Sequence, residues 1–517
     1  MASISELFRP GAPAAPPPDP RAAATELSAA SSAAVYPESV TLLGTAAFFT
    51  ARRHGDKQVG LAWSATGSEP AAAGEFPGRA ESFGGLHLKT TNNAREAAAV
   101  LRGHLAFLRP KLVGLATSLG LGDRLGVATP GHVRAVRGTG LVPFFAQQSI
   151  REMTRTRRTP QEVQDLALLG AMQAGWRSGF GSDADHLKTA QDLDYCLEAG
   201  FTMFTLDPGD HVDGEAERLS GSALAARFEG LPWKALELSA ADCRARYADR
   251  IVPLEGAPAV GLSGEALARA AVKYGRAVAH VVGLYRHLAE RAGRGRFELE
   301  VSVDETESPT TVGEHYYVAG ELARLGVQWV SLAPRFVGRF EKGVDYIGDL
   351  SELRAALEGH AAVARTLGPY KLSIHSGSDK FSVYPLAAEA TRGLVHVKTA
   401  GTSYLEALRT LAAGADRELF REILAFAIGR YGEDRKSYHV SGEMDRALRP
   451  EGLSDAELPG ALDQFDTRQA LHVTFGSVLN AGNYKARLMK ALAEHEELHC
   501  EFLARHLGRH AAPFARG

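Results

Sequence analysis

Cysteine is scarce in this 517-residue chain, and long apolar runs are missing. The three cysteines, Cys196, Cys243 and Cys500, are odd in number and far apart, which argues against a disulfide framework and for a reducing compartment. No apolar run reaches the roughly 20 residues that a membrane-spanning helix needs. We therefore expect a cytoplasmic protein without a membrane partner.

The sequence also lacks an excess of charge of one sign. Its 58 Lys and Arg residues nearly balance 61 Asp and Glu residues, which leaves a formal net charge of −3. A nucleic-acid surface needs a clustered positive field, and no such excess is available here. We therefore expect a small-molecule substrate and no nucleic-acid partner, while a homo-oligomer remains open.

The N-terminal segment lacks the uninterrupted apolar stretch of a secretion signal, because prolines break its Ala-rich residues 11–34. This composition predicts a flexible extension over residues 1–35. Residues 36–110 are then an N-terminal addition, residues 111–490 the catalytic domain, and residues 491–517 a C-terminal helical tail. The chain is long enough for one large domain with such additions.

Short apolar runs alternate with stretches of helical period over most of the chain. This alternation is typical of parallel strands joined by helices, and about eight units predict an α/β fold of the TIM-like (β/α)8 barrel type with insertions. A glycine-rich turn after the first strand, the fingerprint of dinucleotide-binding sheets, is not evident. The predicted strands are Leu112–Ser118, Leu141–Gln147, Phe201–Asp207, Phe297–Val303, Val327–Ala333, Lys371–His375, Leu394–Lys398 and Leu471–Phe475.

Polar side chains follow or end several of these apolar runs. In a parallel barrel the reactive groups gather at the carboxyl ends of the strands, so we expect these side chains to meet. They are Asp304 and Glu305 in FELEVSVDETE, His375 and Lys380 in KLSIHSGSDK, and His396 and Lys398 in GLVHVKTAGTS. A further polar cluster, with Asp185, His186 and Lys188 in GFGSDADHLKT, looks like a glycine-hinged loop.

Each of these residues also has an ordinary structural role. A histidine in an apolar strand is usually a hydrogen-bonded core residue, and an acidic residue after a strand is often a helix cap. Several such loops at equivalent positions favour a shared site, and imidazoles with carboxylates suit Zn, Mn, Ni or Co without choosing among them. The stretch from His495 to His499 matches the zinc-protease pattern H-E-x-x-H, but it lies in a polar helix near the end of the chain and receives little weight.

Seven segments, in order between about Leu112 and Lys490, are more specific together than any one alone. They are SLGLGDRLGVATPGHVRA (118–135), FFAQQSIREMTRTRRTP (144–160), GFGSDADHLKT (179–189), SVDETESPTTVGEH (302–315), IHSGSDKFSVYP (374–385), HVKTAGTSYLEAL (396–408) and LHVTFGS (471–477). At these segments the chain resembles the tagaturonate epimerase family, whose members interconvert tagaturonate and fructuronate in hexuronate breakdown.

The resemblance implies a TIM-barrel-like fold, a divalent metal and epimerisation of D-tagaturonate and D-fructuronate. At the matching positions it makes Asp185 the proton acceptor and Glu305 the proton donor. The implied metal ligands are His186, His375 and, in preference to His315, His396.

The implied reaction inverts a hydroxyl-bearing carbon one position beyond the carbon next to the ketone. The carbonyl does not acidify the hydrogen there, so retro-aldol cleavage with rotation and re-addition is favoured over simple enolisation and over nicotinamide redox. The substrate carboxylate needs guanidinium or ammonium groups, and amides can bind hydroxyls. The candidates are Arg124, Arg151, Lys188, Lys380, Lys398, Gln147 and Gln148.

Three other functions fit the same residues less well. The first is an epimerase of neutral ketohexoses, such as tagatose and fructose, that uses the same metal site. The second is an aldolase, either metal-dependent or with a Schiff base on Lys188 or Lys398. The third is a sugar-binding protein without turnover, which would not need so many polar strand ends.

Overall fold

The computed structural model describes residues 3–248, 250–262 and 264–515. Its centre is a closed barrel of parallel strands in the order β10-β13-β14-β15-β16-β7-β8-β9, which confirms the predicted (β/α)8 barrel. The bounds are β7 Ser118–Gly120, β8 Val142–Ser149, β9 Gly181–Leu187, β10 Met203–Leu206, β13 Glu298–Val303, β14 Ser331–Pro334, β15 Lys371–Ile374 and β16 Val395–Lys398.

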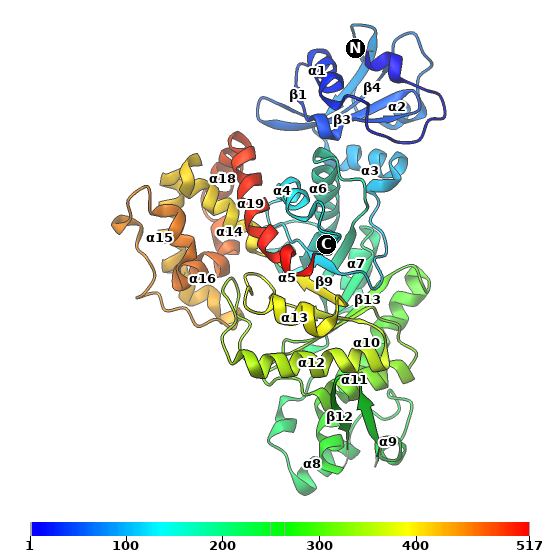
Figure 1. Ribbon diagram of the computed structural model, residues 1–517, viewed down its shortest axis with the longest axis vertical. Helices are drawn as coiled ribbons and strands as arrows, with labels where there is room; N and C mark the ends of the chain where they lie inside the picture. Colours follow the sequence, from blue (N-terminus) through cyan, green and yellow to red (C-terminus); the bar gives the residue numbers. More distant parts are fainter. Residues whose placement is uncertain (1–2, 249, 263, 516–517) are drawn as a thin grey trace.

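Helices follow the barrel strands and cover their outer surface (Figure 1). Three of them, α6, α7 and α11, begin with capping boxes, in which a threonine and an acidic residue satisfy the free N–H groups of the first turn. The capping pairs are Thr159 with Glu162, Thr189 with Asp192, and Thr311 with Glu314. The helices are α4 Thr129–Val136, α5 Ile150–Thr156, α6 Pro160–Gln173, α7 Ala190–Glu198, α10 Gly264–Ala292, α11 Val312–Arg324, α12 Leu350–Leu367, α13 Tyr384–Thr391 and α14 Thr402–Thr410.

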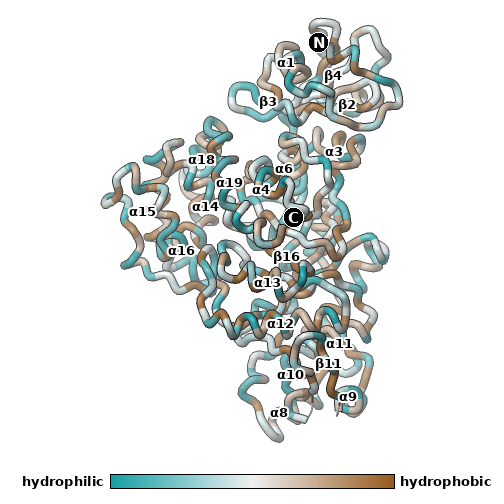
Figure 2. Tube along the Cα trace, viewed as in Figure 1, coloured by the Kyte–Doolittle hydropathy of each residue, from teal (hydrophilic) through white to brown (hydrophobic). Residues whose placement is uncertain are grey.

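The barrel strands alternate between an apolar outer face and a polar inner face. In β13, Leu299 and Val301 belong to the hydrophobic core shared with the surrounding helices, whereas the intervening Glu300 is fully buried inside the barrel. Successive side chains of a strand point to opposite faces, so this pattern places polar groups in the interior. Figure 2 shows apolar and hydrophilic residues alternating along outer helices such as α12, as expected for helices that cover the barrel with one face.

Two of the predicted strands differ from the structure. The residues Leu471–Phe475 belong to α16 (Phe465–Val473) and α17 (Phe475–Asn480), where their apolar side chains are buried between helices. The first barrel strand begins at Ser118, where the predicted strand ends. Strand β9 takes the place of the predicted glycine-hinged loop, because its inward-facing residues are aspartates and it therefore lacks an apolar run.

The N-terminal residues form a separate sheet above the barrel in Figure 1. Its antiparallel strands, in the order β1-β3-β4-β6-β5 with β2 paired to β3, are β1 Ala34–Val35, β2 Thr41–Leu43, β3 Ala46–Arg53, β4 Asp56–Ser64, β5 Glu81–Phe83 and β6 Leu86–Thr91. The segment 1–35, predicted to be flexible, contains helix α1 (Pro20–Ser31) in its described part. Asp19 caps this helix, and Ala23, Ala24 and Leu27 are buried against the sheet.

Two insertions enlarge the barrel (Figure 1). Between β10 and α10 lie α8 (Gly221–Glu229), α9 (Ala240–Tyr247) and the hairpin of β11 (Ile251–Leu254) and β12 (Ala257–Gly261). After α14 comes a helical lobe with α15 (Arg417–Asp434), α16, α17 and α18 (Tyr484–Glu494), and then α19 (Glu496–Ala511), which packs on α4 and α14. In the described part of the chain, no helix has the length and apolar character to cross a membrane.

Candidate active site

The side chain of Lys398, at the end of β16, lies at the centre of a buried ionic network inside the barrel. Its Nζ is 2.9 Å from Asp183 Oδ2, 2.8 Å from Asp185 Oδ1 and 2.6 Å from Glu300 Oε1. It also donates to Thr205 Oγ1 at 2.7 Å. Burial alone would lower the pKa of Lys398, but the three carboxylates raise it well above its ordinary value. Lys398 is therefore a permanent cation that holds three strands together.

Asp185 lies near the carboxyl end of β9, and both of its carboxylate oxygens accept hydrogen bonds. Oδ1 receives the bond from Lys398, and Oδ2 accepts from Gln147 Nε2 at 2.9 Å. Burial alone would raise the pKa of Asp185, but Lys398 and the neighbouring imidazoles lower it. Asp185 is thus a buried, ionised carboxylate held in one orientation.

Two imidazoles lie next to Asp185. The rings of His186 and His375 have centroids 4.9 Å apart, and His186 occupies the left-handed backbone region with φ of 51°. Asp207 Oδ2 is 3.2 Å from His186 Nδ1, and Glu300 Oε1 is 2.6 Å from His375 Nε2. Carboxylates in these positions orient an imidazole, as they do behind metal-binding histidines.

The carboxylates also set the charge of both rings. Burial alone would lower the pKa of His186, but Asp185 and the hydrogen bond to Asp207 raise it to about 9. Burial opposes protonation of His375 too, and Asp304 with Glu300 raises its pKa to about 10. The cluster therefore has a strongly negative electrostatic field that favours cations.

The donor set and this field fit a divalent metal. Ligand atoms of Asp185, His186 and His375 lie within 4.8 Å of one another, and His186 forms a second such group with Asp207 and Glu305. With neutral imidazoles, carboxylates outnumber the cations that contact them, because Lys398 serves three carboxylates at once. Mixed imidazole and carboxylate donors suit Zn, Mn, Ni or Co.

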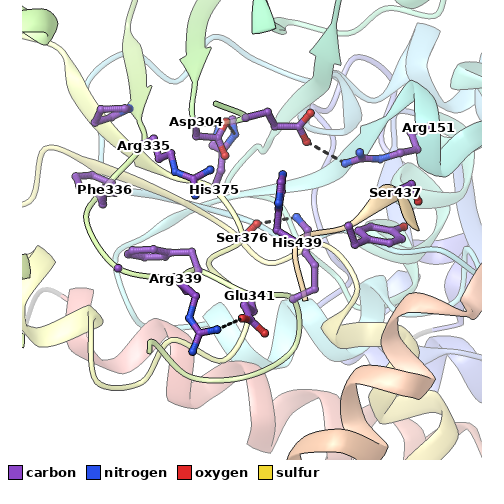
Figure 3. Close-up of a pocket in the computed structure, with 16 residues that line it drawn as sticks. Arg151, Asp304, Arg335, Phe336, Arg339, Glu341, His375, Ser376, Ser437 and His439 are labelled. Atoms are coloured by element: carbon purple, nitrogen blue, oxygen red, sulfur yellow. Dashed lines mark hydrogen bonds and ion pairs between the residues drawn. The ribbon is translucent and has the colours of Figure 1, made fainter. Parts of the chain in front are cut away.

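Two adjoining cavities open onto this cluster. The main cavity, of about 220 Å³, is lined by residues that include Asp304, Glu305 and His375. The small cavity, of about 40 Å³, contains Asp185 and His186. In Figure 3 the labelled side chains of Arg151, Asp304, His375 and His439 surround the main cavity. The lining residues common to both cavities are Arg151, Lys342, His375, Ser376 and Tyr438. Drug-sized ligands occupy pockets of roughly 300 Å³ or more, so these cavities suit a smaller, sugar-sized ligand.

Neither candidate for a third imidazole lies in the cluster. His396 is two residues before Lys398 on β16, so it lies one layer deeper in the barrel, with Nδ1 2.9 Å from Ser118 Oγ. His315 lies on α11, outside the strands, where its nitrogens contact His360 and Tyr370. A carboxylate, that of Asp185, is the third donor that the structure brings to His186 and His375.

Some predicted substrate contacts also lie elsewhere. Lys380 is buried and donates to the backbone carbonyls of Glu341, Val344 and Ser378, so it fastens a loop. Gln148 donates to Glu152 and itself lines neither cavity. Lys188 pairs with Asp210 at 2.8 Å beside the cluster.

Arg124 lines the small cavity, but its guanidinium is already committed. It pairs with Glu152 at 2.8 Å and stacks on the ring of Phe475 at 3.6 Å. Gln147 and Lys398, which the sequence also suggested as substrate contacts, line the small cavity.

Sequence reasoning missed Glu300 and Lys342. Glu300 was hidden inside an apolar run, but the alternation of acidic and apolar residues in ELEVSV shows which of them face the barrel interior. Lys342 lies in the long connection between β14 and α12, where neither an apolar run nor a strand end marks it. The H-E-x-x-H stretch lies at the start of α19, and its histidines join none of the metal-binding groups found among the described residues.

Known proteins of one family match this chain over nearly its whole length. A family model described as tagaturonate epimerase matches residues 36–513. A tagaturonate/fructuronate epimerase of Thermotoga maritima is 45% identical over 419 residues, which cover 80% of this chain and 84% of the relative. Two crystal structures of the fructuronate-tagaturonate epimerase of Cohnella laeviribosi, native and with one glycerol, are each 36% identical, with TM-scores of 0.87 and coverage of 95% of this chain and 98% of theirs.

Proposed function

Because the chain belongs to the tagaturonate epimerase family, and is thus a sugar-acid epimerase of the isomerase class, we propose that it interconverts D-tagaturonate and D-fructuronate with a divalent metal. The observation that supports this most directly is the cluster of Asp185, His186 and His375 at the carboxyl end of the barrel. In barrels of this type the catalytic residues come from the ends of several strands, and Asp185, His186 and His375 lie near the ends of β9 and β15.

The substrate dictates how the inversion can proceed. The inverted carbon carries a hydroxyl and lies one position beyond the carbon next to the ketone. Removal of the hydroxyl proton allows the bond between these two carbons to break, which gives an aldehyde and the enediolate of a three-carbon ketone. Rotation of the aldehyde by half a turn and re-formation of the same bond invert the carbon, and the new alkoxide takes a proton back. No redox partner is needed.

Asp185 is the proposed proton acceptor. It is ionised, lies in the small cavity and has an oxygen near both imidazoles. When Asp185 takes a proton, Lys398 keeps its contacts with Asp183 and Glu300, so the surrounding network need not rearrange. Pre-arranged charges of this kind lower the reorganisation that accompanies proton transfer.

Glu305 is the proposed proton donor on the other side of His186. It comes from the loop after β13, and its Oε1 is 3.1 Å from Arg151 Nη2. Its side chain is about one-third exposed, with a relative accessibility of 34%, whereas that of Asp185 is 8%. Two carboxylates in such different surroundings suit opposite roles in proton transfer.

The metal would be held by His186 and His375, which Asp207 and Glu300 orient. When bound there, a divalent ion supplies Lewis-acid polarisation of the ketone and of a neighbouring hydroxyl.

The ionic network argues against the Schiff-base form of the aldolase alternative. A Schiff base requires a neutral amine, but the pKa of Lys398 is raised well above its ordinary value by the carboxylates around it. The pKa of Lys188 is also raised, with Asp210 and Asp207 outweighing the effect of burial. Neither amine is prepared for nucleophilic attack.

The test is NMR detection of fructuronate formed from tagaturonate, with enzyme stripped by a chelator and then refilled with Mn, Zn, Ni or Co. We expect no turnover from stripped enzyme, recovery with one or more metals, and a loss of about 10²- to 10⁴-fold in Asp185→Asn and Glu305→Gln. His495→Ala, at an exposed histidine of the H-E-x-x-H stretch, is the control and should keep full activity. Turnover by stripped enzyme would refute the proposed metal dependence. The absence of turnover with every metal would refute the assignment of tagaturonate as the substrate.

A further inference from the structure

The geometry points to Lys342 as the residue that binds the substrate carboxylate and so selects a keto-uronate over the neutral ketose of the same length. This inference rests on the proposed epimerase function and names the group that gives it specificity.

Lys342 reaches the reaction site from the connection between β14 and α12. Its Nζ donates to Ser376 Oγ at 2.7 Å, and Ser376 is the neighbour of His375. Lys342 lines both the main and the small cavity. Its ammonium therefore lies where a ligand that starts at the imidazoles would extend.

The charge of Lys342 has no carboxylate partner within 4.0 Å among the residues that the structure describes. Burial and the nearby guanidinium of Arg151 lower its pKa, although Glu305 and Asp304 oppose this effect from a greater distance. The other cations around the cavities differ: Arg151 pairs with Glu305 at 3.1 Å, and Arg339 with Glu341 at 3.3 Å. A half-buried ammonium without a counter-ion is a favourable place for an anionic ligand group.

Arg335 is the other lining cation without a carboxylate partner in the described residues, but its position suits another role. Its guanidinium donates to the backbone carbonyl of Thr306 and so supports the loop that carries Glu305. It lines the main cavity alone, whereas Lys342 lines both. Arg335 therefore serves as the competing candidate in the test.

The length of the substrate agrees with this placement. Four carbon–carbon bonds of about 1.5 Å separate the ketone from the carboxylate, a span of roughly 5 Å in an extended chain. A ketone at His186 and His375 would thus leave the carboxylate about 5 Å away, inside the cavities that Lys342 also lines. In a neutral ketose a hydroxymethyl group takes the place of the carboxylate, and the ammonium would remain without a counter-ion.

The experiment compares kcat/KM for D-tagaturonate and D-tagatose in metal-loaded wild type and variants. We expect Lys342→Gln, which keeps a donor for Ser376, to lower kcat/KM for tagaturonate about 10- to 100-fold, the scale of one charge-assisted hydrogen bond, mainly through KM. Turnover of tagatose should fall by less than about threefold, and Lys342→Arg should recover part of the loss. Arg339→Gln is the matched control, because it removes a lining charge that Glu341 already neutralises; it should change neither substrate appreciably.

Inhibition provides a second measurement if the wild type does not turn over tagatose. D-Glycerate and glycerol differ in one carboxylate, so Lys342→Gln should weaken inhibition by glycerate and leave inhibition by glycerol unchanged. An equal loss for charged and neutral ligands, or the selective loss in Arg335→Gln alone, would overturn the assignment to Lys342. Failure of the wild type to turn over tagaturonate would instead refute the proposed function, and the two failures are therefore distinguishable.

Discussion

Two groups of one aspartate and two histidines have the same composition and different surroundings. The catalytic cluster consists of Asp185, His186 and His375, and the C-terminal cluster of Asp379, His506 and His510. In both, the ligand atoms lie within 4.8 Å of one another. Proximity of donors therefore does not distinguish them, and the difference has to come from charge and access.

Charge is balanced in the C-terminal cluster and unbalanced in the catalytic cluster. Arg468 pairs with Asp379 at 2.8 Å, and Arg409 pairs at 3.0 Å with Glu406, the carboxylate on the far side of His506. Near His186 and His375, one ammonium is shared by three carboxylates, and Asp207 and Asp304 add further negative charge. A divalent ion would complete the catalytic cluster and add excess positive charge to the other.

Access differs between the clusters, whereas each contains a histidine with both nitrogens engaged. His375 contacts Glu300 through Nε2 at 2.6 Å and Asp304 through Nδ1 at 3.2 Å. His510 Nε2 accepts from the backbone N–H of Asp379 at 2.9 Å, and its Nδ1 faces the carbonyl of His506 at 3.1 Å. Both nitrogens are thus engaged, and the cluster is buried between α19 and the loop after β15. The catalytic cluster opens onto a cavity. We infer that uncompensated charge and access to a cavity favour a metal at the catalytic cluster, because the proximity of the donors is the same in both clusters.

The largest difference between the two clusters is expected when one histidine is removed from each. His375→Ala is expected to abolish stoichiometric metal binding and to lower turnover by about 10³-fold, since a Lewis acid contributes several kcal/mol to the transition state. His510→Ala should keep its metal and most of its activity, with a loss of stability only. Metal analysis of purified variants, together with the NMR assay, decides between these outcomes. Loss of metal in His510→Ala would show that the C-terminal cluster is a metal site.

The second-largest expected difference between the two clusters is the pH dependence of metal binding. The pKa values of about 9 for His186 and about 10 for His375 mean that both rings carry protons near neutrality in the metal-free enzyme. Metal has to displace these protons, so its affinity should rise by up to about 100-fold per pH unit and level off above pH 10. Calorimetric titration in buffers of different ionisation enthalpy measures the protons released.

The raised pKa values of His186 and His375 also affect the stability of the folded protein. A raised pKa stabilises the folded, metal-free protein below the unfolded value of 6.5, and this contribution is lost as pH rises through 9 and 10. His510, whose pKa burial lowers to about 3, is neutral over this range and contributes no such change. Metal-free enzyme that is equally stable at pH 7 and pH 10.5 would contradict the predicted protonation of the catalytic imidazoles.

The sequence predicts a structural feature when residues close together in the chain determine that feature. The barrel followed from alternating elements, and Glu305 and His375 from polar residues at strand ends, whereas Asp185 and His186 came from a polar cluster assigned to a loop. The strand carrying Asp185 was read as a loop, because its inward residues are acidic where a strand is expected to be apolar.

Contacts between distant segments could not be predicted. His396 has the right spacing to join the site, but a strand places every second residue one layer further along the barrel, so only Lys398 reaches the level of Asp185. Lys342 lies 34 residues from Ser376, its hydrogen-bond partner, and no local pattern brings them together. The saturation of His510 likewise depends on a backbone N–H 131 residues away.

The stability of the C-terminal cluster gives a further test of the comparison. Asp379→Asn leaves the buried guanidinium of Arg468 without its counter-charge, which typically costs about 3 kcal/mol. Denaturant unfolding measures this loss, while metal content should stay unchanged. Glu389→Gln is the control, since it breaks the exposed pair with Arg354 and should cost less than about 1 kcal/mol. Equal costs for both variants would show that the C-terminal cluster has no special structural role.

The smallest expected effect concerns two neighbouring amides on β8. Gln147 donates to Asp185 at 2.9 Å and lines the small cavity. Gln148 donates to Glu152 and lines neither cavity. Gln147→Ala should lower kcat about 10-fold, the usual scale for a residue that orients a catalytic group, whereas Gln148→Ala should change kcat less than twofold. Steady-state kinetics on metal-loaded enzyme measures both, and equal losses would mean that the amides act through the stability of β8 and that the orientation of Asp185 does not depend on Gln147.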